Sequence, residues 1–194
     1  MAKTKTAIFI SGRGSNMMAL VEAAKASDFP AEFALVVSND PAAAGLEWAA
    51  KHGIATLGVD HRQYKGDREA HERVIDAELR AAGIEFICLA GYMRILTPWL
   101  VEQWNGRMIN IHPALLPHFK GLHTHERAIE AGHEEHGATV HWVTPGVDEG
   151  EVIAQARVPV MPHDTAETLA ARVLVEEHRL YPEAVRRVLS QSLA

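Results

Sequence analysis

The chain has 194 residues, of which 47% are hydrophobic and 23% are charged, and its formal net charge is −6. A chain of this length can bury enough surface to fold without disulfides or a metal. The negative charge argues against a broad nucleic-acid surface, and no apolar run is long enough to span a membrane. The only cysteine, Cys88, lies in an apolar run, which excludes a disulfide framework. No signal peptide precedes the first apolar run, so we expect a single cytoplasmic domain over residues 1–194.

Short apolar runs alternate with helical patterns through the first half of the chain. The expected strands cover residues 6–11, 33–38, 54–59 and 85–89, and the expected helices run from the glycine loop to about 26, over 42–52 and over 66–82. This alternation is typical of an α/β protein with an open, mostly parallel sheet and helices on both of its faces.

The second half of the chain has a different pattern. A strand is expected over 107–111, followed by a loop rich in proline and histidine and a short helix over 124–131. Two further strands, 138–144 and 151–159, flank a turn and predict a β-hairpin. A long C-terminal helix is expected over 164–190, with Asp164 as its N-cap and Glu167 completing a capping box. Pro182 should kink or divide this helix.

A glycine loop, Gly12-Arg13-Gly14, stands between the first strand and the first helix. Glycines let a ligand approach the backbone, and the free N–H groups of the first helical turn attract an anion. Ser15 and Asn16 can add side-chain donors. The loop lacks the third glycine of a dinucleotide site and the lysine of a P-loop. We therefore favour a phosphate monoester as ligand, and the alternative is a tight turn that only begins the helix.

Asn110 and His112 lie two residues apart in an expected strand, so their side chains should share one face. An amide donor beside an imidazole suits the stabilisation of an oxyanion together with proton transfer. Asp148, in the turn of the hairpin, is the expected partner, and its carboxylate should raise the pKa of His112. The alternatives are that Asn110 and His112 tie down the following loop and that Asp148 serves the turn.

Histidines are concentrated in one region, because seven of the chain's 12 lie between His112 and His141. The spacing of His123 and His125 could suggest a metal site. No His-Glu-x-x-His motif is present, however, and the cysteine lies far upstream. We therefore expect no metal and interpret most of these histidines as loop and surface residues.

The chain resembles the phosphoribosylglycinamide formyltransferases, folate-dependent enzymes of purine synthesis, over nearly its whole length. An Asn-x-His motif with a later Asp is shared by all folate formyltransferases, whereas the glycine loop combined with Gly-Leu-His-Thr-His is specific to the glycinamide enzymes. The matching segments occur in the order Ser11-Gly12-x-Gly14-Ser15-Asn16, Met93-Arg94-Ile95-Leu96, Asn110-Ile111-His112-Pro113, Gly121-Leu122-His123-Thr124-His125, Glu134-Glu135-His136-Gly137 and Asp148-x-Gly150. The resemblance implies a Rossmann-like formyltransferase fold.

The resemblance also implies a reaction. The formyl group of 10-formyltetrahydrofolate would move to the amine of glycinamide ribonucleotide, which gives N-formylglycinamide ribonucleotide and tetrahydrofolate on the route to IMP. Asn110 and a protonated His112 would stabilise the tetrahedral oxyanion, and His112 would pass a proton to N10. Asp148 would keep His112 charged and oriented, or relay protons through water.

Binding roles follow from the same resemblance. The residues implied to hold the ribonucleotide are Gly14, Ser15, Asn16, Val147 and Glu177. Those implied to contact the folate are Arg68, Met93, Arg94, Ile95, Leu96, Asn110 and Asp148. Without the resemblance, Glu177 and Arg68 would be ordinary helix-surface charges, and residues 93–96 would be apolar packing. The departures from the family pattern are Arg13, Lys120 and Glu149.

Several alternatives remain open. A formyltetrahydrofolate hydrolase would use the same three residues with water as nucleophile, and a non-catalytic module could bind a phosphorylated metabolite. A tRNA formyltransferase needs a further C-terminal domain that we do not expect here. A histidine-metal hydrolase would lose activity to chelators. The partners expected are small-molecule substrates, without nucleic acid or membrane, and the sequence does not indicate an oligomeric state.

Overall fold

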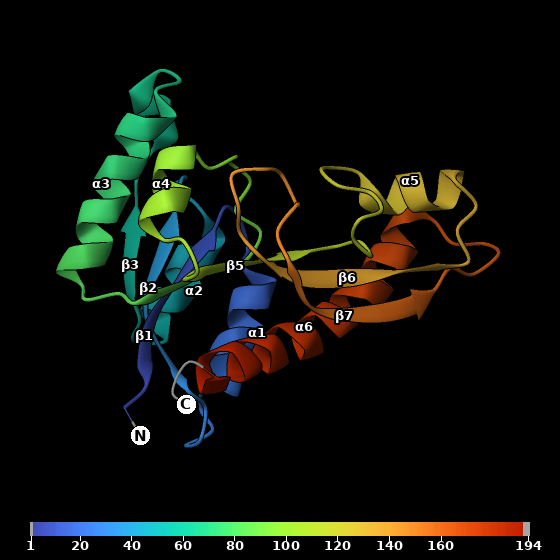
Figure 1. Cartoon of the computed structure of the whole chain (residues 1–194), viewed down its shortest axis with the longest axis horizontal. Coiled ribbons are helices and arrows are strands. Elements are labelled where there is room, and N and C mark those ends of the chain that lie inside the picture. Colours follow the sequence, from blue (N-terminus) through green and yellow to red (C-terminus); the bar gives the residue numbers. More distant parts are fainter. Residues whose placement is uncertain (1, 192–194) are drawn as a thin grey trace.

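The computed structural model describes residues 2–191, and a seven-stranded sheet forms its centre (Figure 1). The strand order is β3-β2-β1-β4-β5-β6-β7. The first five strands pair in parallel, and β6 and β7 continue the sheet in antiparallel fashion. The mostly parallel sheet and the hairpin are thereby confirmed. The strands are β1 (Thr4–Ile10), β2 (Ala31–Ser38), β3 (Ala55–Gly58), β4 (Phe86–Leu89), β5 (Met108–His112), β6 (Glu135–Trp142) and β7 (Val152–Pro159).

All of the expected helices are present, and two short ones had not been expected. The helices are α1 (Ser15–Ala23), α2 (Ala44–Lys51), η1 (His61–Tyr64), α3 (Arg68–Ala81), α4 (Pro98–Gln103), α5 (Thr124–Glu130) and α6 (Ala166–Gln191). Helix α4 and the 3₁₀ helix η1 are too short to show a hydrophobic period. The start of α4 nevertheless carries a signal, because Thr97 caps it and Pro98 occupies its first turn.

The two faces of the sheet bury separate apolar clusters. Alternate residues of β1 divide between them, with Ile8 and Ile10 on one face and Ala7 and Phe9 on the other. Helices α1, α2 and α6 cover the first face, and α3 and α4 cover the second, so the expected helices on both faces are confirmed (Figure 1). Within residues 2–191, no helix is both long and apolar enough to cross a membrane.

Helix α6 corrects two expectations. It continues through Pro182, so of the two expected effects, a kink or a division, the division is wrong. The missing hydrogen bond is outweighed by packing, because Tyr181 and Val185 on either side of the proline are fully buried. The helix also begins later than expected, and Thr165 and Thr168 exchange the hydrogen bonds of its capping box at 2.9 and 3.2 Å. Asp164 instead forms an ion pair with Arg172 at 2.6 Å.

The order of the strands places a crevice at one edge of the sheet. The chain moves outward from β1 to β2 and β3, then crosses back so that β4 pairs with the other side of β1. Ligands bind at the carboxyl ends of strands where the order reverses in this way. Tyr181 supports that edge from α6, because its hydroxyl lies 2.8 Å from the Leu89 carbonyl oxygen and 3.3 Å from that of Ile109.

Candidate active site

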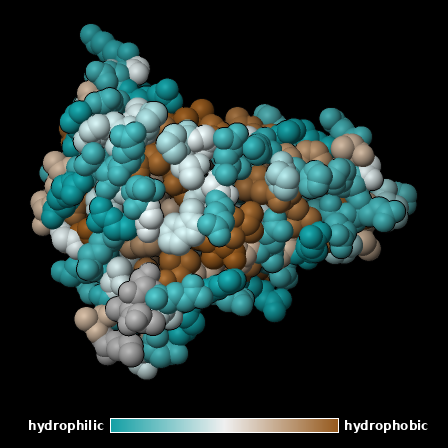
Figure 2. All heavy atoms as spheres, viewed as in Figure 1, coloured by the Kyte–Doolittle hydropathy of each residue, from teal (hydrophilic) through white to brown (hydrophobic). Residues whose placement is uncertain are grey.

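A cavity of about 650 Å³ opens at the carboxyl ends of β4 and β5. Its walls come from the strand ends, from the loops 91–96, 121–126 and 143–148, and from Asn16 and Glu177. Large apolar side chains of these loops are exposed, namely Met93, Ile95, Leu122 and Val147. Figure 2 shows hydrophobic residues at the surface in the middle of one face, framed by hydrophilic ones. A cavity with apolar walls and a few polar groups is typical of a small-molecule site.

Asn110 and His112 lie at the end of β5 and both line this cavity. They share a face of the sheet with Met108, whereas Ile109 and Ile111 pack in the opposite cluster, as the strand period requires. His112 is only 5% exposed. Its Nε2 lies 2.8 Å from the Phe119 carbonyl oxygen. Because a carbonyl only accepts hydrogen bonds, Nε2 carries the ring proton, and in the neutral ring Nδ1 has the free lone pair.

Asp148 links His112 to a second imidazole. Its Oδ2 lies 3.4 Å from His112 Nδ1 and accepts a hydrogen bond of 2.9 Å from the Gly121 N–H. Its Oδ1 lies 3.6 Å from Nε2 of His141. Asp148 has a φ of +52°, a left-handed conformation in which a short polar side chain such as aspartate is tolerated. The turn therefore directs this carboxylate between two histidines.

His141 is a site residue that the sequence analysis did not single out. It pairs with Asn110 across the antiparallel β5–β6 ladder, and its Nε2 lies 3.2 Å from Asn110 Nδ2. Its Nδ1 donates to the Trp142 carbonyl oxygen at 2.9 Å, so Nε2 is free to accept from the amide. The alternation of Thr139 and His141 with buried apolar residues in 138–142 is a signal that could have found it.

The pKa of His112 differs from the sequence expectation. Burial lowers this pKa, and it outweighs the Phe119 carbonyl and the Asp148 carboxylate, which both raise it. The Asp148 carboxylate raises the pKa of His112 as expected, but the effect of burial is larger. For Asp148, burial alone would raise the pKa, yet the neighbouring His141 and His112 and the hydrogen bond from the Gly121 N–H bring it below its usual value. Burial of His112 therefore favours the neutral form of its imidazole beside the Asp148 carboxylate.

The loop over residues 118–123 contacts both His112 and Asp148 through its backbone. Arg127 of α5 fixes this loop, because its guanidinium donates to the carbonyl oxygens of Lys120 at 2.6 Å and Leu122 at 3.1 Å. Two residues that depart from the family pattern also meet here, since Lys120 and Glu149 form an ion pair of 3.2 Å. This exposed pair lies between the loop and the turn that carries Asp148, and exposed pairs of this kind contribute little.

The glycine loop lies beside the cavity. Gly14 has a φ of 72° and precedes α1, whose first N–H groups receive no side-chain cap. Asn16 is 8% exposed, and its Nδ2 donates to Oε1 of Glu177 at 3.1 Å, while its Oδ1 has no partner. Glu177 is also buried, and burial raises its pKa. The interpretation of Glu177 as an ordinary surface charge is therefore wrong. Gly14 and Ser15 directly precede Asn16 but do not line the cavity.

The residues implied to bind folate lie in two places. Met93, Arg94, Ile95 and Leu96 form one wall of the cavity, and Val147 faces it from the hairpin turn. Arg68 does not line the cavity; it lies at the start of α3 and donates to the Ile95 carbonyl oxygen at 3.1 Å. Its contact with the wall is therefore through the backbone of the loop.

Comparison with known proteins identifies the family. A model of the formyl transferase family, "Formyl transferase", matches residues 4–185. The chain belongs to this family. It is 44% identical over 175 residues to the phosphoribosylglycinamide formyltransferase of Escherichia coli (strain K12), covering 90% of the chain and 82% of that protein. It matches the crystal structure of phosphoribosylglycinamide formyltransferase from Brucella melitensis with a TM-score of 0.92 and 51% identity, covering 96% of each chain.

This formyl transferase is also similar to a much longer protein. The trifunctional purine biosynthetic protein adenosine-3 of Drosophila pseudoobscura pseudoobscura is 46% identical over 193 residues. The alignment covers 98% of the chain but only 14% of that protein. The resemblance inferred from the motifs is thus confirmed, and so is the Rossmann-like α/β fold.

Three histidines of the formyl transferase, His118, His133 and His136, have ring contacts with Phe119. His125 Nδ1 lies 3.2 Å from His136 Nε2, and the rings of His118 and His133 pack edge-on against each other. Over residues 2–191, no three His, Cys, Asp or Glu side chains are grouped so that they could hold a metal ion. Burial and the neighbouring histidines lower the pKa of His136 to about 4.

We expect the buried histidines to make stability fall in acid. The lowered pKa means that His136 binds a proton more weakly in the folded protein than in the unfolded chain. The neutral side chain therefore favours the folded state. This contribution to the unfolding free energy is complete above the unfolded pKa of 6.5 and is lost as the pH falls towards about 4. The full shift corresponds to roughly 3 kcal/mol of unfolding free energy. Urea unfolding measured between pH 7.5 and 4.5 should show this loss, and His136→Gln should show a shallower one. Equal slopes in the two proteins would contradict the assignment.

Proposed function

We propose that this formyl transferase moves the formyl group of 10-formyltetrahydrofolate to the amine of glycinamide ribonucleotide, producing N-formylglycinamide ribonucleotide and tetrahydrofolate in purine synthesis. The observation that carries the proposal is the group formed by Asn110, His112 and Asp148, which line a cavity that also reaches Asn16, just after the glycine loop. The relatives named phosphoribosylglycinamide formyltransferase support it, because the match extends over most of both chains.

The glycine loop and α6 form the proposed ribonucleotide subsite. The uncapped N–H groups at the start of α1, with Gly14 and Ser15, suit the phosphate. Glu177 suits the ribose hydroxyls, because a carboxylate accepts two such hydrogen bonds and the free Oδ1 of Asn16 accepts another. Val147 would contact the ribonucleotide from the hairpin turn.

The opposite wall forms the proposed folate subsite. Met93, Ile95 and Leu96 offer apolar surface for the ring system of the folate. Arg94 in the same wall and the exposed Arg68 beside it offer positive charge for the carboxylates of the folate tail. Asn110 and Asp148 close the inner end, where the formyl group must reach the amine.

The proposed mechanism starts from the neutral imidazole. The amine attacks the formyl carbon, and the carbonyl π electrons move to oxygen, where the Asn110 amide can donate a hydrogen bond. His112 Nδ1 then takes the excess proton of the attacking nitrogen, and the new positive charge forms an ion pair with Asp148. His112 returns this proton to N10 as the bond between N10 and the formyl carbon breaks. In the sequence analysis His112 starts protonated and gives its proton to N10, whereas in this mechanism it first takes that proton from the attacking amine.

We further propose that residues 1–194 form one formyl transferase domain that acts on small molecules in the cytoplasm, without a metal. The continuous sheet and the family match over residues 4–185 support a single unit, although residues 1 and 192–194 lie outside the described part of the chain.

Release of tetrahydrofolate, followed by absorbance with a 10-formylfolate substrate, tests the function directly. We expect release only when glycinamide ribonucleotide is added, and an unchanged rate in EDTA, because the proton transfers are assigned to His112. Release without the ribonucleotide would indicate a formyltetrahydrofolate hydrolase. No release under either condition would favour the binding module, and loss of activity in EDTA would favour a metal hydrolase.

A further inference from the structure

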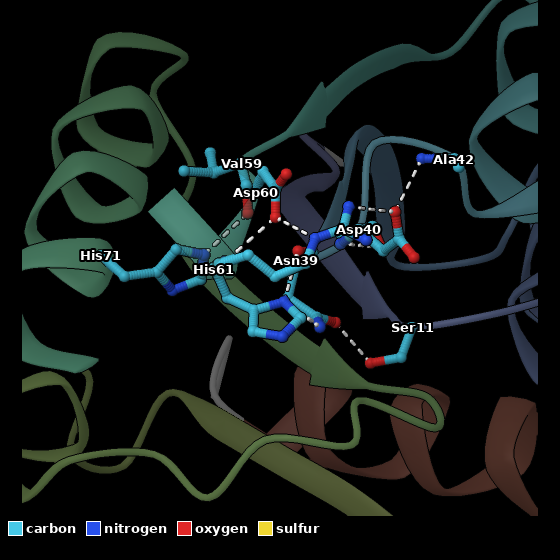
Figure 3. Close-up of polar contacts among 10 residues, drawn as sticks. Ser11, Asn39, Asp40, Ala42, Val59, Asp60, His61 and His71 are labelled. Atoms are coloured by element: carbon cyan, nitrogen blue, oxygen red, sulfur yellow. Dashed lines mark hydrogen bonds and ion pairs between the residues drawn. The ribbon is translucent and has the colours of Figure 1, made fainter. Parts of the chain in front are cut away.

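A polar cluster made of Ser11, Asn39 and His61 lies at the carboxyl edge of the sheet, outside the cavity wall (Figure 3). Ser11 follows β1, Asn39 follows β2, and His61 begins η1. The cluster therefore gathers three segments that are far apart in sequence at the edge where both proposed substrate loops begin. Ser11 directly precedes the glycine loop.

The direction of each hydrogen bond of the Ser11 hydroxyl can be assigned. The Met93 backbone N–H donates to Ser11 Oγ at 2.8 Å. The hydroxyl proton of Ser11 is then free for Asn39 Oδ1, which lies 2.6 Å away (Figure 3). The Nδ2 of Asn39 lies 3.1 Å from His61 Nδ1, which also lies 3.0 Å from the backbone carbonyl oxygen of Asn39. Asn39 is 6% exposed, so the amide has little freedom to turn. Both hydrogen-bonding roles of the Ser11 hydroxyl are thus used.

The opposite side of the glycine loop is held by α2. The Gly45 N–H donates to the Gly12 carbonyl oxygen at 3.0 Å. A Cβ added at Gly45 would approach Ile10 Cδ1 to 2.4 Å and the Gly12 and Arg13 carbonyl oxygens to 3.0 Å, so the loop and helix are in close contact. With this side fixed by backbone packing, the hydroxyl of Ser11 is the side-chain link from the loop towards residues 91–96.

We propose that Ser11 is a positioning residue that fixes both substrate-binding loops at once. Ser11 directly precedes Gly12, so it fixes the position of the backbone where the glycine loop begins. Its hydroxyl accepts a hydrogen bond from the Met93 N–H and so fixes the position of the loop 91–96, which forms the folate wall. Ser11 does not line the cavity, so it acts on the substrates only through these loops. The inference rests on the proposed function, because it needs the ribonucleotide at one loop and the folate at the other.

The test is the Michaelis constant for each substrate in Ser11→Ala. Loss of the hydroxyl leaves the Met93 N–H without its acceptor and releases Asn39, so KM for glycinamide ribonucleotide and KM for 10-formyltetrahydrofolate should each rise roughly fivefold. The value of kcat should change less than about twofold, since Asn110, His112 and Asp148 keep their own contacts. Ser11→Thr retains the hydroxyl and should restore both KM values.

Ser38→Ala is the matched control. Ser38 is fully buried at the end of β2, and the hydrogen bond recorded for its hydroxyl comes from the Asp40 N–H at 3.1 Å, not from either substrate loop. It should leave both KM values unchanged. The proposal would be overturned if Ser11→Ala raised only one KM, raised neither, or lowered kcat alone. It would also be overturned if Ser11→Thr had the same KM values as Ser11→Ala. If Ser11→Ala does not fold, Ser11→Cys, with its weaker hydrogen bonds, serves in its place. Absence of ribonucleotide-dependent turnover in the unaltered protein would instead reject the proposed function.

Discussion

His112→Gln is expected to lower kcat by roughly 10²- to 10³-fold, the range typical for loss of a proton-transfer group. The glutamine amide can still donate to the Phe119 carbonyl oxygen, so the loop that contacts His112 should remain in place. No group then remains at Nδ1 to carry the proton from the attacking amine to N10. The KM values should change little, because the walls of both proposed subsites are unaltered. Steady-state kinetics with each substrate varied in turn measures this.

The pH profile gives a second readout for the same variant. The neutral form of His112 is the reactive one, and burial lowers its pKa below 6.5. In the unaltered protein kcat/KM should therefore be retained above that lowered pKa and be lost as the pH falls through it. His112→Gln should lack this acid limb. The exposed His163 provides a control, and His163→Gln should leave both rate and profile unchanged. Turnover within tenfold of normal in His112→Gln would rule out the shuttle.

The parts of the fold that depend on local pattern could be predicted from the sequence. Alternating apolar runs and helical periods gave the strands and the longer helices, because those periods follow from backbone geometry. Helix α4 was missed since its six residues span less than two turns. The undivided α6 was missed for another reason. The burial of Tyr181 and Val185 against the sheet outweighs the local preference of Pro182, and burial of this kind is tertiary information.

In the candidate site too, features set by local sequence pattern could be predicted, and features set by tertiary contacts could not. The spacing of Asn110 and His112 was enough to place both side chains on one face, since the strand period is local. The position of His141 depends on the register of β6 against β5, which no local pattern states. The pKa of His112 was expected to rise because only its charged neighbour could be inferred from the sequence. Its burial, which lowers the pKa, comes from the loop over residues 118–123 and the hairpin turn.

Asp148→Asn is expected to lower kcat by roughly 10²-fold while the chain remains folded. Asparagine is well suited to the left-handed conformation at this position, and its amide oxygen can still accept from the Gly121 N–H. What is lost is the negative charge 3.4 Å from His112 Nδ1, which stabilises the imidazolium formed during proton transfer. The effect should therefore fall on kcat, with the thermal midpoint close to that of the unaltered protein.

The direction of the pH shift separates this electrostatic role from a structural one. Asp148 raises the pKa of His112, so its neutralisation should lower that pKa further and move the acid limb of kcat/KM to lower pH. A residue that merely shaped the turn would reduce the rate without moving the limb. Glu149→Gln is the matched control, because it removes the adjacent charge from an exposed pair with Lys120 and should change kcat less than about twofold. If Asp148→Asn is slower but the acid limb does not move, Asp148 only shapes the turn. Its charge would then not stabilise the imidazolium of His112 in the proposed mechanism.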